Sequence, residues 1–230
     1  MLVKDWISAT PITVDADASV GQAIDLLNNN HLSMLPVMQD GKLVGAVTDL
    51  NLKPLALSGG LSLGGLDLSL VLRRIRVSDV MSRAPVTVPL DYSVEETAEV
   101  MLYNDVPGVV VIDHSNQVLG VFTQADTNRV LVAVTGHRRG GIVLGFVLED
   151  RPGSIKELTD ILRAHGGRLA SILSSYERTP KGQRRVHIRV RGLDRAELPV
   201  IREELGKKAR LLYVIDLREN RRELFEDVNL

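Results

Sequence analysis

Two short stretches decide how this chain folds: Thr10–Val14 (TPITV) and Ala84–Val88 (APVTV), which lie 74 positions apart and are near copies of each other. The residues in front of them repeat as well, since the Val-x-Asp of Val3–Asp5 returns as that of Val77–Asp79. An internal repeat of this length is typical of two copies of one supersecondary unit. We therefore expect the first half of the chain to hold two similar units packed against each other.

The repeat continues through a second shared stretch, because Gly45–Thr48 (GAVT) returns as Gly120–Thr123 (GVFT). The offset is now 75, and we place the inserted residue in the turn around 114–116, where insertions are tolerated. The apolar patterns predict the order strand, helix, hairpin and helix in each copy. Two capping boxes start the first helices: Ser19-x-x-Gln22 and Ser93-x-x-Glu96.

The amino-acid composition excludes several classes of protein and of functional site. The 230 residues carry a net charge of −1 and are 44% hydrophobic, so no global field attracts nucleic acid or anionic membrane and a sizeable core is possible. Cysteine is absent, which excludes disulfides, thiolate zinc sites and a cysteine nucleophile. No apolar run is long enough for a signal peptide or a membrane span. We expect a cytoplasmic protein.

The stretch Gly120–Asp126 (GVFTQAD) combines a glycine, two apolar residues, a threonine, two variable residues and an aspartate. This pattern resembles the phosphate and ribose motif of the CBS domain family, and the resemblance covers roughly residues 1–135 as a tandem pair, called a Bateman module. The first copy matches only as far as Thr48, because Asn51 stands where the family has aspartate.

The resemblance implies an adenosine ligand, namely AMP, ADP, ATP or adenosylmethionine. A threonine hydroxyl and the free N–H groups of a helix start can bind phosphate, as expected of Thr123, and the Asp126 carboxylate can accept both ribose hydroxyls. Asn51 offers one acceptor oxygen and no charge, and Thr123 can also be a simple N-cap. Lys53 and Arg129 stand close enough to add positive charge. The implied nucleotide-binding residues are Ile12, Thr13, Thr48, Asn51, Val86, Thr87, Gly120, Thr123, Asp126 and Arg129.

After residue 141 the repeat stops and a new pattern begins. Apolar periodicity predicts the order βαββαβ, an α+β ferredoxin-like sandwich of two helices on one antiparallel sheet. The turn Asp150–Gly153 (DRPG) and the Gly166-Gly167 exit resemble an ACT domain, a module that binds amino acids in many regulated proteins. The resemblance implies an amino-acid effector near the loop after the first strand, at Asp150, Pro152, Gly153 and Ser154. The alternative is that Pro152 and Gly153 only make the turn.

The expected domains are therefore CBS domain 1 (1–57), a Gly/Leu-rich linker with a short helix (58–76), CBS domain 2 (77–135), the ACT domain (141–218) and a charged tail (219–230). The linker glycines lack the Gly-Lys-Ser/Thr of a Walker motif. The tail is expected to dock as a short helix or to fray. Alternation within 185–191 predicts a basic sheet face, with arginines that are solvated or paired with acidic residues. This face carries Arg185, His187, Arg189 and Arg191.

No catalytic motif is present, since the five histidines are scattered and no Gly-x-Ser-x-Gly or acidic metal loop occurs. We therefore expect no enzyme activity, no metal and no required cofactor. A tandem CBS pair with an ACT domain resembles the acetoin utilisation (AcuB) family, which implies a regulatory metabolite sensor that acts as a homodimer or through a partner protein. Two alternatives remain open: an assembly protein with empty clefts, and a nucleic-acid-binding regulator that uses the basic strand.

Overall fold

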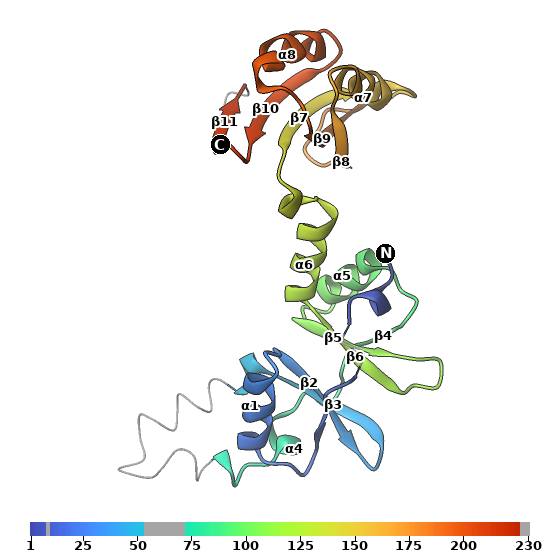
Figure 1. The fold of residues 1–230 in the computed structure, drawn as a ribbon. Helices are drawn as coiled ribbons and strands as arrows, with labels where there is room; N and C mark the ends of the chain where they lie inside the picture. Colours follow the sequence, from blue (N-terminus) through green and yellow to red (C-terminus); the bar gives the residue numbers. More distant parts are fainter. Residues whose placement is uncertain (8–9, 53–71, 226–230) are drawn as a thin grey trace. The chain divides into compact units, whose positions relative to one another are not determined.

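The computed structural model describes residues 1–7, 10–52 and 72–225 and divides into two compact units, Met1–Arg129 and Val130–Leu230 (Figure 1). The protein is of the α+β class. Lys53, the glycine-rich stretch 58–65 and most of the short helix expected before residue 76 lie outside the described residues. Within the described part of the chain, no helix has the length and apolar character needed to cross a membrane.

Each copy in the first unit forms a three-stranded sheet with helices beside it. The sheet orders are β1-β2-β3 and β4-β5-β6, and in each sheet the first pair is parallel and the second antiparallel. The first copy comprises β1 (Val14–Asp15), α1 (Val20–Asn29), β2 (Met34–Gln39), β3 (Lys42–Thr48) and helical residues 49–52. The second comprises β4 (Thr87–Pro89), α5 (Val94–Tyr103), β5 (Gly108–Ile112), β6 (Val118–Thr123) and α6 (Gln124–Val134).

Both predicted capping boxes are confirmed. The N–H of Gln22 donates to the Ser19 hydroxyl over 3.2 Å, and the Gln22 side chain accepts from the N–H of Ser19. Ser93 and Glu96 repeat the arrangement at the start of α5. Because a capping box satisfies two N–H groups that the helix itself leaves unpaired, it fixes where each helix begins.

The two sheets of the first unit meet through small and medium apolar side chains. Met34 and Ala46 of the first copy form a buried cluster with Val110 of the second. At Gly108 an added Cβ would lie 3.0 Å from the Met34 sulfur and 3.1 Å from the Phe122 carbonyl oxygen. The close packing around position 108 therefore favours glycine there.

The segment in front of each copy packs on the other copy. The 3₁₀ turn η1 (Val3–Asp5) lies against the second copy, since the N–H of Val3 donates to the Tyr92 carbonyl over 2.8 Å. The short helix α4 (Val77–Val80) lies against the first copy, since the N–H of Val77 donates to the Ala18 carbonyl over 2.9 Å. The chain therefore crosses from one copy to the other before each of the two Pro-containing stretches.

The second unit is a five-stranded antiparallel sheet in the order β11-β10-β7-β9-β8, with two helices on one face (Figure 1). Its core lies between that face and the helices, where Leu158, Leu162, Ile201 and Leu205 are buried. The elements are β7 (Ile142–Glu149), α7 (Ser154–Ala164), β8 (Arg168–Ser175), β9 (Gln183–Arg191), η3 (Arg195–Glu197), α8 (Leu198–Gly206), β10 (Arg210–Asp216) and β11 (Arg221–Leu224), and a further 3₁₀ turn, η2 (His137–Arg139), precedes β7.

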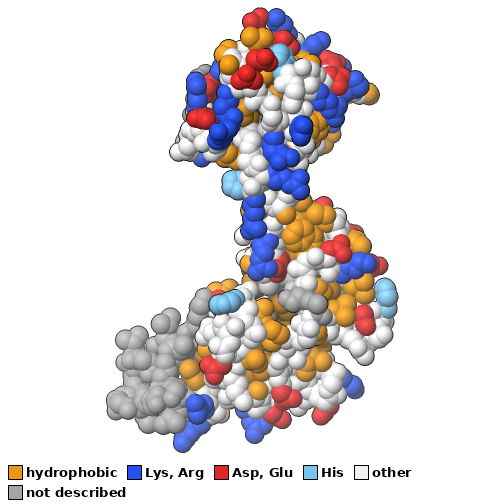
Figure 2. Space-filling view, viewed as in Figure 1, with side chains coloured by type: hydrophobic (Ala, Val, Ile, Leu, Met, Phe, Trp, Pro, Cys, Tyr) orange, Lys and Arg blue, Asp and Glu red, His pale blue; other side chains and the backbone are white. Residues whose placement is uncertain are grey.

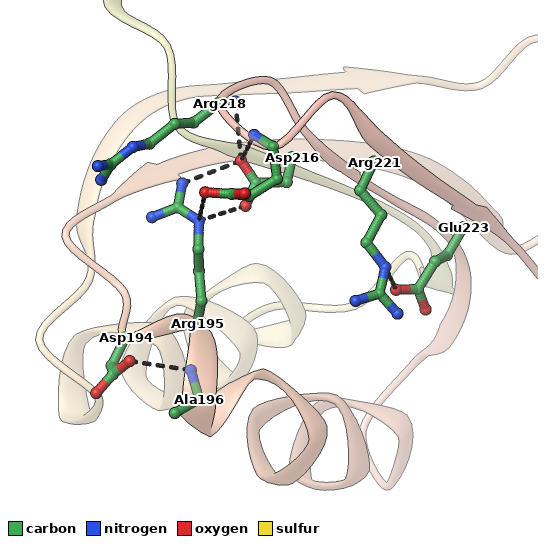
Figure 3. Close-up of polar contacts among 8 residues, drawn as sticks. Asp194, Arg195, Ala196, Asp216, Arg218, Arg221 and Glu223 are labelled. Carbon is green, nitrogen blue, oxygen red and sulfur yellow. Dashed lines mark hydrogen bonds and ion pairs between the residues drawn. The ribbon is translucent and has the colours of Figure 1, made fainter.

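The expectation for the charged tail was wrong for residues 221–224, which form an edge strand rather than a helix or a frayed end, while residues 226–230 lie outside the described residues. Ion pairs fix the end of β10 and the following strand (Figure 3). Arg195 donates from Nε and Nη2 to the buried Asp216 carboxylate over 2.6 and 3.0 Å, and this contact holds the pKa of Asp216 below its ordinary value. Arg202 of α8 pairs with Glu223 of β11.

The expectation for the basic strand was wrong at Arg189. This side chain is buried, with 7% of the residue exposed, and is neither solvated nor paired with a carboxylate. Its Nε donates to the Thr135 carbonyl over 2.6 Å and its Nη1 to the Gly140 carbonyl over 3.3 Å. The Ser171 hydroxyl donates to the same Thr135 carbonyl over 2.8 Å. Arg189 therefore fixes the segment that leads into β7.

A substitution at Gly145 tests the packing on the sheet face opposite the helices. The Tyr213 ring lies against it, and an added Cβ at Gly145 would come within 2.5 Å of that ring. We expect Gly145→Ala to lower the free energy of unfolding by about 1–3 kcal/mol, because overpacking displaces the ring. Gly206→Ala is the control, since no atom lies within 4 Å of its added Cβ. Equal stabilities of the two variants in urea unfolding would contradict the close packing of the Tyr213 ring on Gly145.

His165 gives the second unit a pH-dependent contact between its helices. Its Nδ1 lies 2.8 Å from Glu197 and its Nε2 3.4 Å from Glu204, and the hydrogen bond with Glu197, followed by that with Glu204, raises the pKa of His165. A raised pKa in the folded state stabilises the fold below the ordinary value of 6.5, and this stabilisation is lost as the pH rises through the raised pKa.

We therefore expect His165→Gln to destabilise the protein below about pH 6 and to have a shrinking effect at higher pH. Urea unfolding across this range measures the difference from the wild type. His114→Gln, at an exposed hairpin turn, is the matched control for the loss of an imidazole ring. A His165→Gln effect that grows with pH would show that the sign is wrong.

Candidate ligand clefts

The junction between β6 and α6 is organised by one carboxylate. Oδ2 of Asp126 accepts hydrogen bonds from the N–H of Thr123 over 2.9 Å and from its hydroxyl over 2.7 Å. Both residues are buried, with exposed fractions of 6% for Thr123 and 8% for Asp126. The second oxygen, Oδ1, accepts from Arg129 over 2.5 Å. Oδ2 therefore holds the turn, while Oδ1 pairs with Arg129, whose side chain is 64% exposed.

The first copy builds the same turn with an amide. Oδ1 of Asn51 accepts from the N–H of Thr48 over 3.1 Å and from its hydroxyl over 2.7 Å. The Asn51 N–H returns a bond to the Thr48 hydroxyl over 3.2 Å. Because the amide oxygen is used within the turn, the Asn51 NH₂ group stands where Asp126 has its second oxygen. Asparagine therefore keeps the turn and replaces an outward acceptor with a donor.

A cleft of about 350 Å³ opens beside the Thr123 turn, and we name it cleft A. Five of the predicted residues line it together: Ile12, Gly120, Thr123, Asp126 and Arg129. The other lining residues are Trp6, Ile7, Thr10, Pro11, Asn30, His31, Leu32, Ser33, Val121 and Ala125. Residues of both copies therefore line cleft A, because the segment in front of the first copy packs on the second copy.

A second cleft of about 260 Å³, which we name cleft B, lies beside the Thr48 turn. The predicted residues Thr48, Asn51 and Val86 line it, so Val86 of the second copy lies beside the motif of the first. The other lining residues are Met34, Ala46, Leu50, Ser82, Ala84, Pro85, Asp105, Val106, Pro107 and Gly108. Cleft B is thus the counterpart of cleft A with the roles of the copies exchanged.

Two predicted residues lie apart from both clefts. Thr13 is in the lining of neither, and Thr87 lines a separate hollow by the hairpin turns with Met38 and Asn116. The hydroxyl of Thr123 also differs from its expected use, because its hydrogen is already donated to Asp126. Ala125, in the first turn of α6, lines cleft A together with Arg129.

Sequence reasoning missed two cleft residues that the repeat could have revealed. His31 lines cleft A and Asp105 lines cleft B, and the two positions are 74 apart. Both have left-handed backbones, with φ of 53° and 51°. The N–H of each donates to the carbonyl three residues earlier over 3.3 Å, so the two side chains leave equivalent turns. The repeat offset of 74, applied to residues outside the motif, would have identified this pair.

The predicted effector residues of the second unit surround the start of α7. The Ser154 hydroxyl donates to the Arg151 carbonyl over 2.9 Å and accepts from Arg184 over 3.0 Å. Asp150 accepts from the Tyr176 hydroxyl over 3.5 Å, and Gly153 precedes the helix with φ of 86°. Of this set, Ser154 lines a nearby cavity of about 370 Å³ with Lys208 and Arg210, whereas Asp150, Pro152 and Gly153 are not in its lining.

Within residues 1–7, 10–52 and 72–225, no group of three or more His, Cys, Asp or Glu side chains comes together in a way that could hold a metal ion.

Comparison with known proteins identifies the repeat. The family model for the CBS domain matches residues 3–53 and 77–133. A CBS domain-containing protein of Dictyostelium discoideum is 33% identical over 135 residues, which are 58% of this chain and 93% of that protein. The L-aspartate semialdehyde sulfurtransferase of Methanocaldococcus jannaschii is 28% identical over 130 residues, and this chain spans only 23% of its length.

A solved structure of a CBS domain pair, in complex with 5′-methylthioadenosine and S-adenosyl-L-methionine, is 27% identical to this chain. It covers 58% of this chain and 97% of its own, with a TM-score of 0.47.

The two turns predict how position 126 tolerates change. We expect Asp126→Ala to lower the free energy of unfolding by about 1–3 kcal/mol, because the buried Thr123 N–H and hydroxyl lose their acceptor. Asp126→Asn should be close to neutral, since Asn51 makes the same two contacts in the first copy. Urea unfolding compares the variants. Equal losses for alanine and asparagine would contradict the role of Oδ2.

Proposed function

The chain belongs to the CBS domain family, and on this premise we propose that it is a non-catalytic regulatory protein that binds an adenosine nucleotide in cleft A. The observation that carries the proposal is that the two oxygens of the Asp126 carboxylate have different partners. One oxygen holds the turn, and the other forms an ion pair with Arg129, whose side chain is 64% exposed and can give way to a ligand. A carboxylate oxygen in this position suits the hydroxyls of a ribose.

The charges around cleft A support a phosphorylated ligand. Arg129 stands one helical turn beyond Asp126 and forms an ion pair with it. The Arg129 guanidinium can exchange the Asp126 carboxylate for a phosphate of the ligand, because a phosphate also carries negative charge. The N–H groups of Gln124 and Asp126 already donate to the Pro107 carbonyl and the Thr123 hydroxyl, so the start of α6 contributes the backbone of Ala125, which lines the cleft. The His31 ring adds a further hydrogen-bonding group. Pro11, Ile12 and Val121 supply apolar surface for a purine ring. In this arrangement Thr123 positions Asp126 rather than donating to the ligand.

The second unit is proposed to be a ferredoxin-like ACT domain, as in the AcuB family. Four of its strands lie in the order β10-β7-β9-β8, with both helices on one face, which supports this proposal. An amino-acid effector would lie at the start of α7, where Gly153 leaves the first N–H groups without a side-chain cap. The nucleic-acid alternative loses support, because Arg189 is buried on backbone carbonyls and is not available to a phosphate.

A sensor without catalytic chemistry acts through a change of the surface that it offers to another protein. Hydrophobic side chains gather over the α5 region of the first unit (Figure 2), where Leu102 is 80% and Tyr103 89% exposed. Exposed apolar clusters of this kind mark interaction surfaces. They support the proposal that the protein works as a homodimer or with a partner protein.

The proposal is tested by isothermal titration with AMP, ADP, ATP and S-adenosylmethionine. We expect at least one of the phosphorylated compounds to bind the wild type and to bind Asp126→Asn about 10- to 100-fold more weakly, since hydrogen bonds to a charged group contribute about 1.5–3 kcal/mol. This variant keeps the turn, so the loss reports the ligand contact.

Asp91→Asn is the control for this titration, because it removes the same charge at an exposed position outside both clefts. It should bind like the wild type. A folded wild-type protein that binds none of the compounds would contradict the proposal and favour the assembly protein with empty clefts.

A further inference from the structure

Four exposed arginines lie at one end of the sheet of the second unit. Arg168 begins β8 and Arg191 ends β9, and the two are paired directly across the strands. Arg138 and Arg139 belong to η2, just in front of β7. We name these four residues the arginine patch. Figure 2 shows Lys and Arg side chains gathered where the chain enters the second unit.

Contacts with β8 and β9 hold η2 beside the other two arginines. An added Cβ at Gly136, on one side of η2, would lie 3.7 Å from the Cβ of Ala170 in β8. An added Cβ at Gly141, on the other side, would lie 2.9 Å from the Cγ of Arg191 in β9. The segment between these glycines is held on both strands, so the two arginines of η2 belong to the same surface as those of the strands.

The described part of the chain does not neutralise the charges of the patch. None of the four side chains forms an ion pair or a side-chain hydrogen bond with a described residue. Carboxylates at the same end of the sheet have another partner. Asp216 accepts two hydrogen bonds from Arg195 (Figure 3), and Glu219 lies 3.7 Å from the same arginine. The patch therefore keeps its positive charge.

Two charges of the patch act against the fold. Like charges directly opposite each other destabilise a pair of strands, and Arg168 faces Arg191 in this way. Arg189, on the same face of β9, shows what a structural arginine does here, because it is buried and donates to two backbone carbonyls. The patch arginines make no such contacts. Their arrangement suits an anion that comes from outside the chain.

An acidic protein segment fits this surface better than a nucleic acid. Guanidinium groups bind carboxylates in a bidentate geometry, and a run of Asp or Glu side chains supplies several carboxylates at once. A nucleic-acid surface on a sheet generally offers rings on which bases stack. Two rings on this face, His187 and Tyr213, instead stack on each other with their centroids 5.9 Å apart.

We propose that the arginine patch is a docking surface for an acidic segment of a partner protein. The inference rests on the proposed function and deepens it, because it names the chemistry of the partner through which the sensor acts. The patch belongs to the second unit and contributes no residue to cleft A or cleft B. Docking and ligand binding are therefore measured independently.

The test measures the binding of a fluorescein-labelled oligoglutamate peptide to the full chain, by fluorescence anisotropy at low salt. We expect Arg168→Gln/Arg191→Gln to weaken this binding by about fivefold or more, because two of the four cations are lost. Added salt should weaken the binding of the wild type. Arg178→Gln/Lys181→Gln is the matched control and should bind like the wild type, because it removes the same charge from the exposed turn at the other end of the same strands.

Urea unfolding distinguishes docking from a structural role of the two strand arginines. Arg168→Gln/Arg191→Gln should be at least as stable as the wild type, because the like charges across the strands are removed. A lower stability of this variant would overturn the inference, as would peptide binding equal to that of the wild type.

Two further outcomes would overturn the inference. One is a wild type that does not bind the peptide, and the other is a wild type that binds a single-stranded oligonucleotide more tightly than the peptide. The proposed function is judged separately, by titration of the same proteins with the adenosine nucleotides. Nucleotide binding that is weakened by Asp126→Asn and unchanged in Arg168→Gln/Arg191→Gln would keep the proposed function whatever the peptide result.

Discussion

The first unit depends on the turn in which a side-chain oxygen accepts both the N–H and the hydroxyl of a threonine. Oδ2 of Asp126 holds Thr123 in this way, and Oδ1 of Asn51 holds Thr48. The turn ends a strand and starts a helix at a fixed residue, and so it directs the first turn of that helix toward the cleft. Without it, neither the helix start nor the carboxylate would have a defined position beside a ligand.

Local signals in the sequence predicted much of the first unit. The repeat, the capping boxes and the hairpin patterns correspond to elements of the structure, because each depends on residues close together in the chain. The lining of the clefts could not be predicted in the same way. Val86 lies beside Thr48 rather than Thr123 because α4 and η1 pack on the opposite copies, and this exchange depends on contacts between residues far apart in sequence.

The second unit shows the same limit. Alternation predicted a basic face within residues 185–191, and the residues between the basic ones, Val186, Ile188 and Val190, lie in the core. It could not show the partners of Arg189, because these are backbone carbonyls, which every residue type has. The edge strand β11 was missed for a similar reason: its charged residues look solvated until Arg202 is seen to pair with Glu223.

The matched turns at Thr48 and Thr123 have a consequence for how such a protein diversifies. Asparagine and aspartate codons differ by one base, and either residue satisfies the same threonine. A duplicated unit can therefore gain or lose a ligand contact in a single mutational step that does not pass through an unstable intermediate. Selection on folding does not distinguish the two residues, so the chemistry of each cleft is free to drift on its own after the duplication.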